Sequence, residues 1–485
     1  MPSRDPARPN ILFVLTDDQG PWAMGCAGSP EIRTPNLDRL ATEGLRFRNF
    51  FCTSPVCSPA RASILTGRIP SSHGVHDWLS GGNSLVDRPP LGLIEFLRGQ
   101  TGFTDLLARG GYACGLSGKW HLGDAHHPQK GFGFWRVHAK GGGPYYAAPM
   151  IRDGEVYKES RYVTDVITDN ALAFLDEQAD ASAPFYLGVH YTAPHSPWGR
   201  AEHPPEFFEP YYNRNEFPSF PQGLPVPAFA RFLSIVPENA EQRREFLSGY
   251  CAAITAMDAQ VGRLLDRLER LGLRESTLVV FTSDNGMNMG HHGVYGKGNA
   301  TFPQNMFEES VKVPTLLSLP GCAPAGQVVE DLCSHLDLRP TLLELAGIRD
   351  EEAGALPGRS FAALLDGRPL AQPRGEVIVH DEYGPVRMVR TDRWKYIHRY
   401  PYGPHELYDL TEDPGETRNL AGSPEHADRT ADLRGRLESW FLRWGDPERD
   451  GCREAVTGGG QFGLCGPAGA GRERFAPVPG NWKTI

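Results

Sequence analysis

The stretch NILFVLTDDQG, residues 10–20, carries the pattern that decides the fold: an apolar run that ends in charged and hydrogen-bonding side chains. Three further runs end in the same way: residues 112–116 before Lys119 and His121, residues 185–190 before His195, and residues 278–282 before Asp284 and Asn285. Short apolar runs of this length, bounded by glycine and proline, are typical of buried strands. The chain is therefore predicted to contain several buried strands with polar ends.

Helical patterns lie between these predicted strands. Apolar residues spaced by three and four over residues 250–268 form one stripe, and a weaker pattern covers residues 163–175. Strands that alternate with helices predict an α/β fold with a large, mostly parallel sheet flanked by helices. Ligands of such sheets bind at the carboxyl ends of the strands. We therefore expect the four polar strand ends to meet at one cleft.

The pattern changes after residue 370. Three short strands are predicted over residues 376–380, 386–391 and 394–398, followed by a helix near residues 431–443. These features predict a smaller C-terminal α+β domain with an antiparallel sheet. The expected domains are a catalytic domain over residues 1–370 and a C-terminal domain over residues 371–485, which ends in a glycine-rich tail.

Composition and charge exclude several function classes. The chain has 485 residues, 49 Lys and Arg against 59 Asp and Glu, and a formal net charge of −10 without a basic run, so nucleic acid is not an expected partner. No apolar run approaches the roughly 20 residues of a membrane span. Nine scattered cysteines do not form a disulfide framework, and the N-terminal stretch shows no export signal. These observations predict a cytoplasmic protein that is not bound to a membrane.

Asp17, Asp18, Asp284 and Asn285 are candidate metal ligands. Each pair follows an apolar run, so four oxygen ligands are placed to meet without nitrogen or sulfur. Hard oxygen donors favour Ca²⁺, with Mg²⁺ as the alternative. Taken singly, each pair also fits a helix cap or a tight turn, in which Asp, Asn and Gly are the commonest residues. The occurrence of both pairs after strands favours the metal.

The segment Cys57-Ser58-Pro59-Ala60-Arg61 fits a Cys-x-Pro-x-Arg signature, and residues 118–123 read Gly-Lys-Trp-His-Leu-Gly. Together with residues 10–20, 282–286, 295–297 and 406–420, these motifs stand in the order found in the type I sulfatases. The chain therefore resembles that family of formylglycine-dependent enzymes within the alkaline phosphatase superfamily. The resemblance implies an alkaline-phosphatase-like fold and hydrolysis of a sulfate monoester to an alcohol and inorganic sulfate.

The resemblance also implies the chemistry at residue 57. A dedicated maturation enzyme oxidises Cys57 to Cα-formylglycine, whose hydrate binds the metal with Asp17, Asp18, Asp284 and Asn285 and attacks the sulfate sulfur. This covalent step is followed by elimination of sulfate as the aldehyde reforms. The residues implied to assist are Arg61 and Lys119 as counter-charges, His121 as the base of the second step, and His195 and Lys297 at the leaving oxygen.

Several alternatives remain open. Lys312 competes with Lys297 as the later active-site lysine. A phosphodiester or phosphonate monoester hydrolase of the same superfamily is an alternative activity, and an inactive binder of sulfated saccharides is the non-enzymatic one. The substrate is a sulfated small molecule or saccharide, and substrate choice is expected in two long loops, residues 124–150 and 198–227. Their aromatic residues offer stacking surfaces: Trp135, Tyr145, Tyr146 and Trp198.

Overall fold

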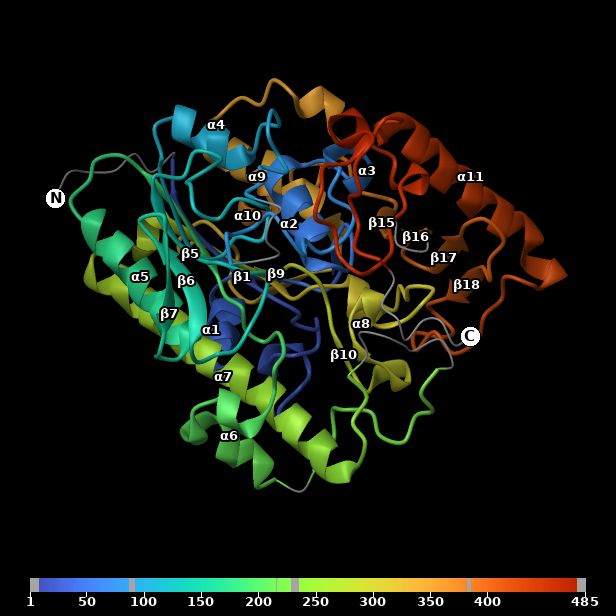
Figure 1. Cartoon of the computed structure of the whole chain (residues 1–485), viewed down its shortest axis with the longest axis horizontal. Coiled ribbons are helices and arrows are strands. Elements are labelled where there is room, and N and C mark those ends of the chain that lie inside the picture. Colours follow the sequence, from blue (N-terminus) through green and yellow to red (C-terminus); the bar gives the residue numbers. More distant parts are fainter. Residues whose placement is uncertain (1–7, 87–91, 215, 228–234, 382–384, 478–485) are drawn as a thin grey trace.

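A computed structural model of the chain describes residues 8–86, 92–214, 216–227, 235–381 and 385–477 (Figure 1). Residues 1–7, residue 215 of the second predicted loop and the last eight residues of the predicted tail lie outside the described ranges. Among the residues that are described, none of the helices combines the length and the apolar character that a membrane-spanning segment requires.

One large mixed sheet of ten strands, counted over the described ranges, forms the centre of the molecule. From one edge to the other its strands are β13 (Gln327–Val329), β2 (Leu45–Phe47), β12 (Thr315–Ser318), β9 (Thr277–Ser283), β1 (Asn10–Thr16), β8 (Phe185–His190), β4 (Ala113–Lys119), β5 (Phe134–His138), β6 (Ala148–Arg152) and β7 (Glu155–Glu159).

The four strands predicted to end in polar side chains are neighbours in this sheet. They stand in the order β9, β1, β8, β4, and each adjacent pair is parallel. Their carboxyl ends therefore lie along one edge, as expected from the sequence. Antiparallel strands flank them, with β12 beside β9 on one side and β6 and β7 beyond β5 on the other.

Helices cover both faces of the sheet (Figure 1). On one face lie α1 (Pro35–Glu43), α5 (Val163–Glu177), α6 (Pro205–Tyr212) and α7 (Ala240–Arg270). On the other face lie α2 (Cys57–Thr66), α3 (Pro70–His73), α4 (Phe103–Arg109), α9 (Leu338–Leu345) and α10 (Ala362–Leu365). Strand β1 shows why: Leu12 and Val14 belong to the core under α7, whereas Ile11 and Phe13 belong to the core under α2. The predicted α/β fold is confirmed.

The antiparallel sheet predicted for the C-terminal region is confirmed, and within the described residues it has four strands where the sequence predicted three. Its strands and helix are β15 (Val377–Asp381), β16 (Val386–Arg390), β17 (Trp394–Arg399), β18 (Glu406–Asp409) and α11 (Ala427–Trp444). One face packs against α11, while the other contributes Val379, Met388 and Ile397 to the core that also contains α2. The two sheets thus share one core, and the expected boundary at residue 370 stays a prediction.

Three short elements complete the frame. Two-stranded sheets pair β10 (Asn288–Met289) with β11 (Tyr295–Gly296) and β14 (Cys333–Ser334) with β3 (Phe50–Phe51). Helix α8 (Glu308–Val311) contacts the C-terminal sheet. Lys395 of β17 is fully buried and pairs with Glu308 of this helix at 3.2 Å.

The first predicted substrate loop, residues 124–150, contains more regular structure than expected. It holds β5 and most of β6, and β6 turns into β7 through Asp153 and Gly154. Both turn residues have positive φ, 53° and 81°, which is the geometry of a two-residue hairpin turn. Helix α6 likewise lies within the second predicted loop.

Candidate active site

The acidic pairs lie at the ends of two adjacent strands. Asp17 and Asp18 follow β1, and Asp284 and Asn285 follow β9. Carboxylate oxygens of Asp17, Asp18 and Asp284 all lie within 4.8 Å of one another, and the three residues are buried. Asn285 donates from Nδ2 to Asp18 Oδ1 at 2.8 Å, which leaves its Oδ1 as the free oxygen.

This cluster fits a divalent cation. Asp17 Oδ1 and Asn285 Oδ1 are buried and have no hydrogen-bond partner among the described residues, which is costly unless another group binds them. Burial raises the pKa of Asp17, and repulsion from the nearby Asp284 carboxylate raises it further. A donor set made of carboxylate and amide oxygens is the one that Ca²⁺ and Mg²⁺ prefer.

Cys57 is the first residue of α2, a helix whose ten residues are all buried. Pro59 in the first turn lacks an N–H that the helix would leave unpaired, and Gly67 ends the helix in the left-handed conformation at φ 67°. Lys297 Nζ lies 2.8 Å from Cys57 Sγ. Burial raises the pKa of the Cys57 thiol to about 12, although the charges of Lys119 and Lys297 act in the opposite direction.

Arg61 lies one helical turn after Cys57 and joins α2 to the acidic cluster. Its Nε donates to Asp284 Oδ2 at 2.8 Å, and a second guanidinium nitrogen donates to the carbonyl oxygen of Lys119 at 3.1 Å. Burial alone would raise the pKa of Asp284, but the positive charges of Arg61 and Lys119 outweigh it and lower that pKa. Asp284 is therefore held as a carboxylate.

Two lysines enter the cluster from different elements. Lys119, the last residue of β4, is fully buried and donates from Nζ to Asp17 Oδ2 at 2.5 Å. Lys297 follows β11 and donates to Asp18 Oδ1 at 2.5 Å. Lys312 points elsewhere: it pairs with Glu308 at 2.7 Å and lies over the Phe51 ring. Of the two candidates for the later lysine, Lys297 is the one that contacts Cys57.

The two ring nitrogens of His121 have different surroundings. Its Nε2 donates to the carbonyl oxygen of Leu79 at 3.0 Å, and its Nδ1, also buried, is unpartnered within the described ranges. Burial, together with the charge of Lys119, lowers the pKa of His121 well below its ordinary value, so the ring is neutral. Gly141 packs against it so closely that a Cβ there would lie 2.1 Å from the ring.

His195 lies in the loop after β8, at the mouth of the site. Its Nε2 is 3.6 Å from Asp18 Oδ2, and its Nδ1 contacts the carbonyl oxygen of Ser196 at 2.7 Å. Its side chain is 26% exposed, so it reaches both the acidic cluster and solvent.

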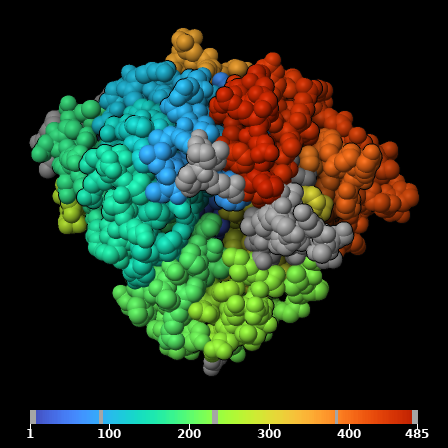
Figure 2. All heavy atoms as spheres, viewed as in Figure 1, coloured from blue at the N-terminus to red at the C-terminus, as the bar shows by residue number. Residues whose placement is uncertain are grey.

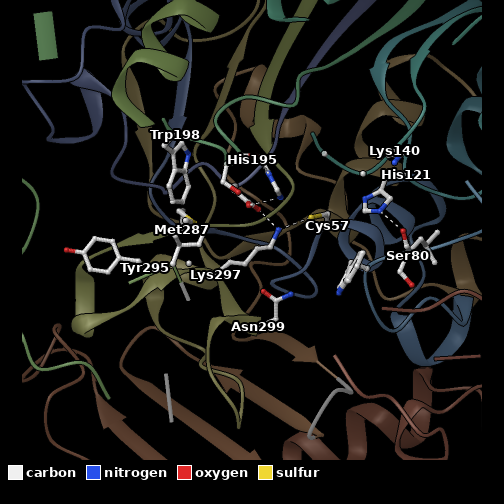
Figure 3. A pocket seen from close by; sticks show the side chains of 18 of the residues that line it. Cys57, Ser80, His121, Lys140, His195, Trp198, Met287, Tyr295, Lys297 and Asn299 are labelled. Carbon is white, nitrogen blue, oxygen red and sulfur yellow. Dashed lines mark hydrogen bonds and ion pairs between the residues drawn. The ribbon is translucent and has the colours of Figure 1, made fainter. Parts of the chain in front are cut away.

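Five of the site residues border a cavity of about 650 Å³: Asp18, Cys57, His121, His195 and Lys297 (Figure 3). Figure 3 shows Lys297 reaching toward Cys57, with His195 to one side of the thiol and His121 to the other. In the view of Figure 2, early (blue), middle (green) and C-terminal (red) segments of the chain border one another on the surface. The structure thus brings together every residue that the sequence nominated for the site: Asp17, Asp18, Cys57, Arg61, Lys119, His121, His195, Asp284, Asn285 and Lys297.

The walls of the cavity include residues that the sequence did not nominate. They include Trp78 and Asn83 from one loop, Lys140 from a second and Asn299 from a third. Of the aromatic residues proposed for stacking, Trp198 borders the cavity, whereas Trp135 packs in the core against Trp120 and Tyr145 stacks on Tyr162. Aromatic content alone did not separate wall residues from packing residues.

Comparison with known proteins places the whole of this site within one family. A family model described as Sulfatase matches residues 9–348, and one described as N-sulphoglucosamine sulphohydrolase, C-terminal, matches residues 290–441. The N-acetylglucosamine-6-O-sulfatase of Bacteroides thetaiotaomicron is 30% identical over 518 residues, covering 91% of this chain and 88% of that protein.

Two further relatives show the breadth of the match. The choline-sulfatase of Rhizobium meliloti is 29% identical over 457 residues, covering 86% of this chain and 83% of that protein. The solved structure of BT4656 in complex with its substrate D-glucosamine-2-N,6-O-disulfate has a TM-score of 0.76 at 26% identity, covering 92% of this chain and 100% of that chain.

A family-model match over well more than half of the chain shows membership: this chain belongs to the sulfatase family. It is an enzyme, a sulfatase that hydrolyses sulfate esters, as the resemblance implied.

Proposed function

We propose that this sulfatase cleaves its ester through a formylglycine formed at Cys57 and one divalent cation, Ca²⁺ with Mg²⁺ as the alternative. The observation that supports it most is that two buried oxygens, Asp17 Oδ1 and Asn285 Oδ1, have no hydrogen-bond partner among the described residues, while a carboxylate oxygen of Asp17 lies within 4.8 Å of Cys57 Sγ. Asp17, Asp18, Asp284 and Asn285 would hold the cation.

An unmodified Cys57 is a poor nucleophile for this task. A buried thiol whose pKa is raised to about 12 stays protonated at neutral pH. Sulfur is also a soft ligand beside oxygen donors that suit a hard cation. In the conversion to formylglycine, a maturation enzyme would pass two electrons from Cys57 to an external oxidant and release the sulfur as sulfide, so that an aldehyde oxygen takes its place. When present, the cation supplies positive charge for the sulfate oxygens, and the aldehyde hydrate supplies the attacking hydroxyl.

The surrounding side chains then have separate tasks. Lys119 and Lys297 bring two ammonium groups to the position where sulfate charge develops, and Arg61 keeps Asp284 ionised and fixed. His195, at the mouth, is placed to protonate the departing alcohol oxygen. His121 keeps its proton on Nε2, so Nδ1 is the nitrogen that accepts the proton in the second step.

We further propose that the substrate is a sulfated saccharide. Two of the relatives act on sulfated glucosamine derivatives, as their names state. The cavity offers aromatic surface at Trp78 and Trp198, amides at Asn83 and Asn299, and the ammonium group of Lys140. Aromatic faces with adjacent polar groups suit a sugar ring. The choline-sulfatase relative makes choline sulfate, a small ester without a sugar ring, the natural comparison.

Two measurements test this proposal. Mass spectrometry of the tryptic peptide over residues 49–61 is expected to show an aldehyde in place of the Cys57 thiol. Turnover of 6-sulfated N-acetylglucosamine is expected to exceed that of choline sulfate, an aryl sulfate and an aryl phosphonate, with Cys57→Ala as the inactive control. Hydrolysis by protein that carries only intact thiol would overturn the mechanism, and faster phosphonate turnover would favour the phosphorus ester alternative.

A further inference from the structure

The segment of residues 457–476, here called the tail, packs against residues 74–83 from the first part of the chain. Both matched family ranges end before the tail begins, at residues 348 and 441. In Figure 1 the red C-terminal loops lie across α2 and α3, and Figure 2 shows red atoms directly beside blue ones. Residues 78–80 and Asn83 of the contacted loop line the catalytic cavity.

Gln461 is the centre of this contact and is fully buried. Its side-chain Oε1 accepts from the backbone N–H groups of His76 at 2.8 Å and Asp77 at 3.4 Å. Its Nε2 donates to the carbonyl oxygen of Gly74 at 3.0 Å. One amide side chain therefore binds the backbone of the loop at three positions, Gly74, His76 and Asp77.

The backbone of Gln461 extends the same contact. Its N–H donates to the carbonyl oxygen of Trp78 at 2.8 Å, and its carbonyl accepts from the N–H of Ser80 at 2.8 Å. This strand-like pairing brackets Leu79, which is the residue paired with Gln461 in a parallel bridge. The position of the Leu79 peptide is thus fixed from the tail side.

The other side of Leu79 faces the reacting groups. Its N–H donates to Ser58 Oγ at 3.1 Å, next to Cys57 in α2. Its carbonyl oxygen accepts from His121 Nε2 at 3.0 Å and from Asn83 Nδ2 at 2.9 Å. The Leu79 carbonyl is therefore the group that selects the tautomer and the direction of the His121 ring.

We propose that Gln461 is a positioning residue for catalysis: it holds the Leu79 carbonyl in place, so that the His121 ring keeps its proton on Nε2 and presents Nδ1 to the reacting group. The inference rests on the role proposed above for His121. It adds a segment of the chain beyond the matched family ranges to the machinery of the reaction.

The test uses the full-length protein with Gln461→Met, which preserves side-chain volume and removes the hydrogen bonds of the amide. We expect kcat to fall by ~10- to 100-fold with KM within about 2-fold, because a displacement of roughly 1 Å in a catalytic group has an effect of this size. Arg472→Ala, at an exposed tail position, is the matched control and should keep the wild-type kcat.

A double-mutant cycle with His121→Ala separates positioning from simple loss of structure. If Gln461 acts through His121, the double variant turns over within about 3-fold of His121→Ala alone. Wild-type kcat in Gln461→Met, or losses that multiply in the double variant, would overturn the inference. Should Gln461→Met melt at a much lower temperature than the wild type, Gln461→Glu, which keeps the oxygen acceptor, replaces it in the same cycle.

A readout that needs no turnover keeps this inference separate from the proposed function. In a ¹⁵N spectrum of histidine-labelled protein, the His121 signals are assigned by their loss in His121→Ala. They should show a neutral ring with the proton on Nε2 in the wild type and a changed pattern in Gln461→Met. An unchanged pattern would contradict the inference even if the wild type hydrolysed no sulfate ester.

Discussion

At the scale of single residues, the site depends on charges that are buried in pairs. Lys297 is 8% exposed and contacts both Asp18 and Cys57. Lys312, fifteen positions later, is bound to Glu308 outside the cavity. Since a buried ammonium group beside a developing anion stabilises the transition state far more than a distant one, these two lysines form a natural pair for comparison.

Replacing each lysine by methionine tests which of them serves the reaction. We expect Lys297→Met to lower kcat by at least ~100-fold, which is the effect of losing one preorganised donor. Lys312→Met should keep kcat within about 3-fold, measured well below its melting temperature because its pair with Glu308 is lost. Equal kcat losses in the two variants would remove the catalytic role of Lys297.

The sequence indicated which residues would gather at the site because their motifs are contiguous or follow strands directly. Asp17 and Asp284 could be paired because parallel strands bring their carboxyl ends together. Trp78 and Lys140 could not be found in this way. They lie in irregular segments, where no periodicity links the amino-acid sequence to a direction in space.

At the scale of elements, the apolar runs predicted β1, β8 and β9 to within one residue and β4 to within three. The β6–β7 hairpin was missed for a physical reason: β7 is at least partly exposed at four of its five residues and rich in charged residues, so no apolar run marks it, and only three of the five residues of β6 are buried. A local signal was present in the Asp153-Gly154 dipeptide, which favours a two-residue hairpin turn.

The contact between the tail and the loop depends on a glycine. Gly460 has φ 103°, and a Cβ there would lie 2.4 Å from the Cβ of Ser80, whereas Gly471 has φ 75° with no atom within 4 Å of its Cβ position. Both substitutions by alanine impose backbone strain of roughly 1–2 kcal/mol. Only the substitution at Gly460 also forces the tail away from Ser80.

We therefore expect Gly460→Ala to lower kcat by ~10-fold or more. Gly471→Ala should lower thermal stability slightly and leave kcat unchanged. Steady-state kinetics and melting curves of the two variants check this. A similar loss of kcat in both would mean that tail strain, rather than displacement of the loop, is responsible.

At the scale of the whole molecule, the acidic cluster is a set of buried charges at the centre of one shared core. Lys119, Lys297 and Arg61 offset the charges of its three carboxylates, yet two oxygens of the cluster still lack partners among the described residues. A ligand that binds only the folded state stabilises it by about 4 kcal/mol at 1,000 times its dissociation constant.

Ca²⁺ should accordingly raise the melting temperature by several degrees, and a chelator should reverse the shift. Differential scanning calorimetry of wild type and of Cys57→Ala checks this, because the second protein keeps the acidic cluster without any modified residue. Titration of Ca²⁺ and Mg²⁺ ranks the two cations. A melting temperature that responds to neither would exclude the proposed site.

The contact of the tail with residues 74–83 can form only late in translation. Gln461 is added about 400 residues after Cys57, so at the usual ribosomal speed of roughly 5–20 residues per second the cavity wall is completed roughly 20–80 s later. In the finished protein Cys57 is only 4% exposed. If Cys57 is converted as proposed above, the converting enzyme would act while the chain is still growing, and its supply during translation would set the fraction of active molecules.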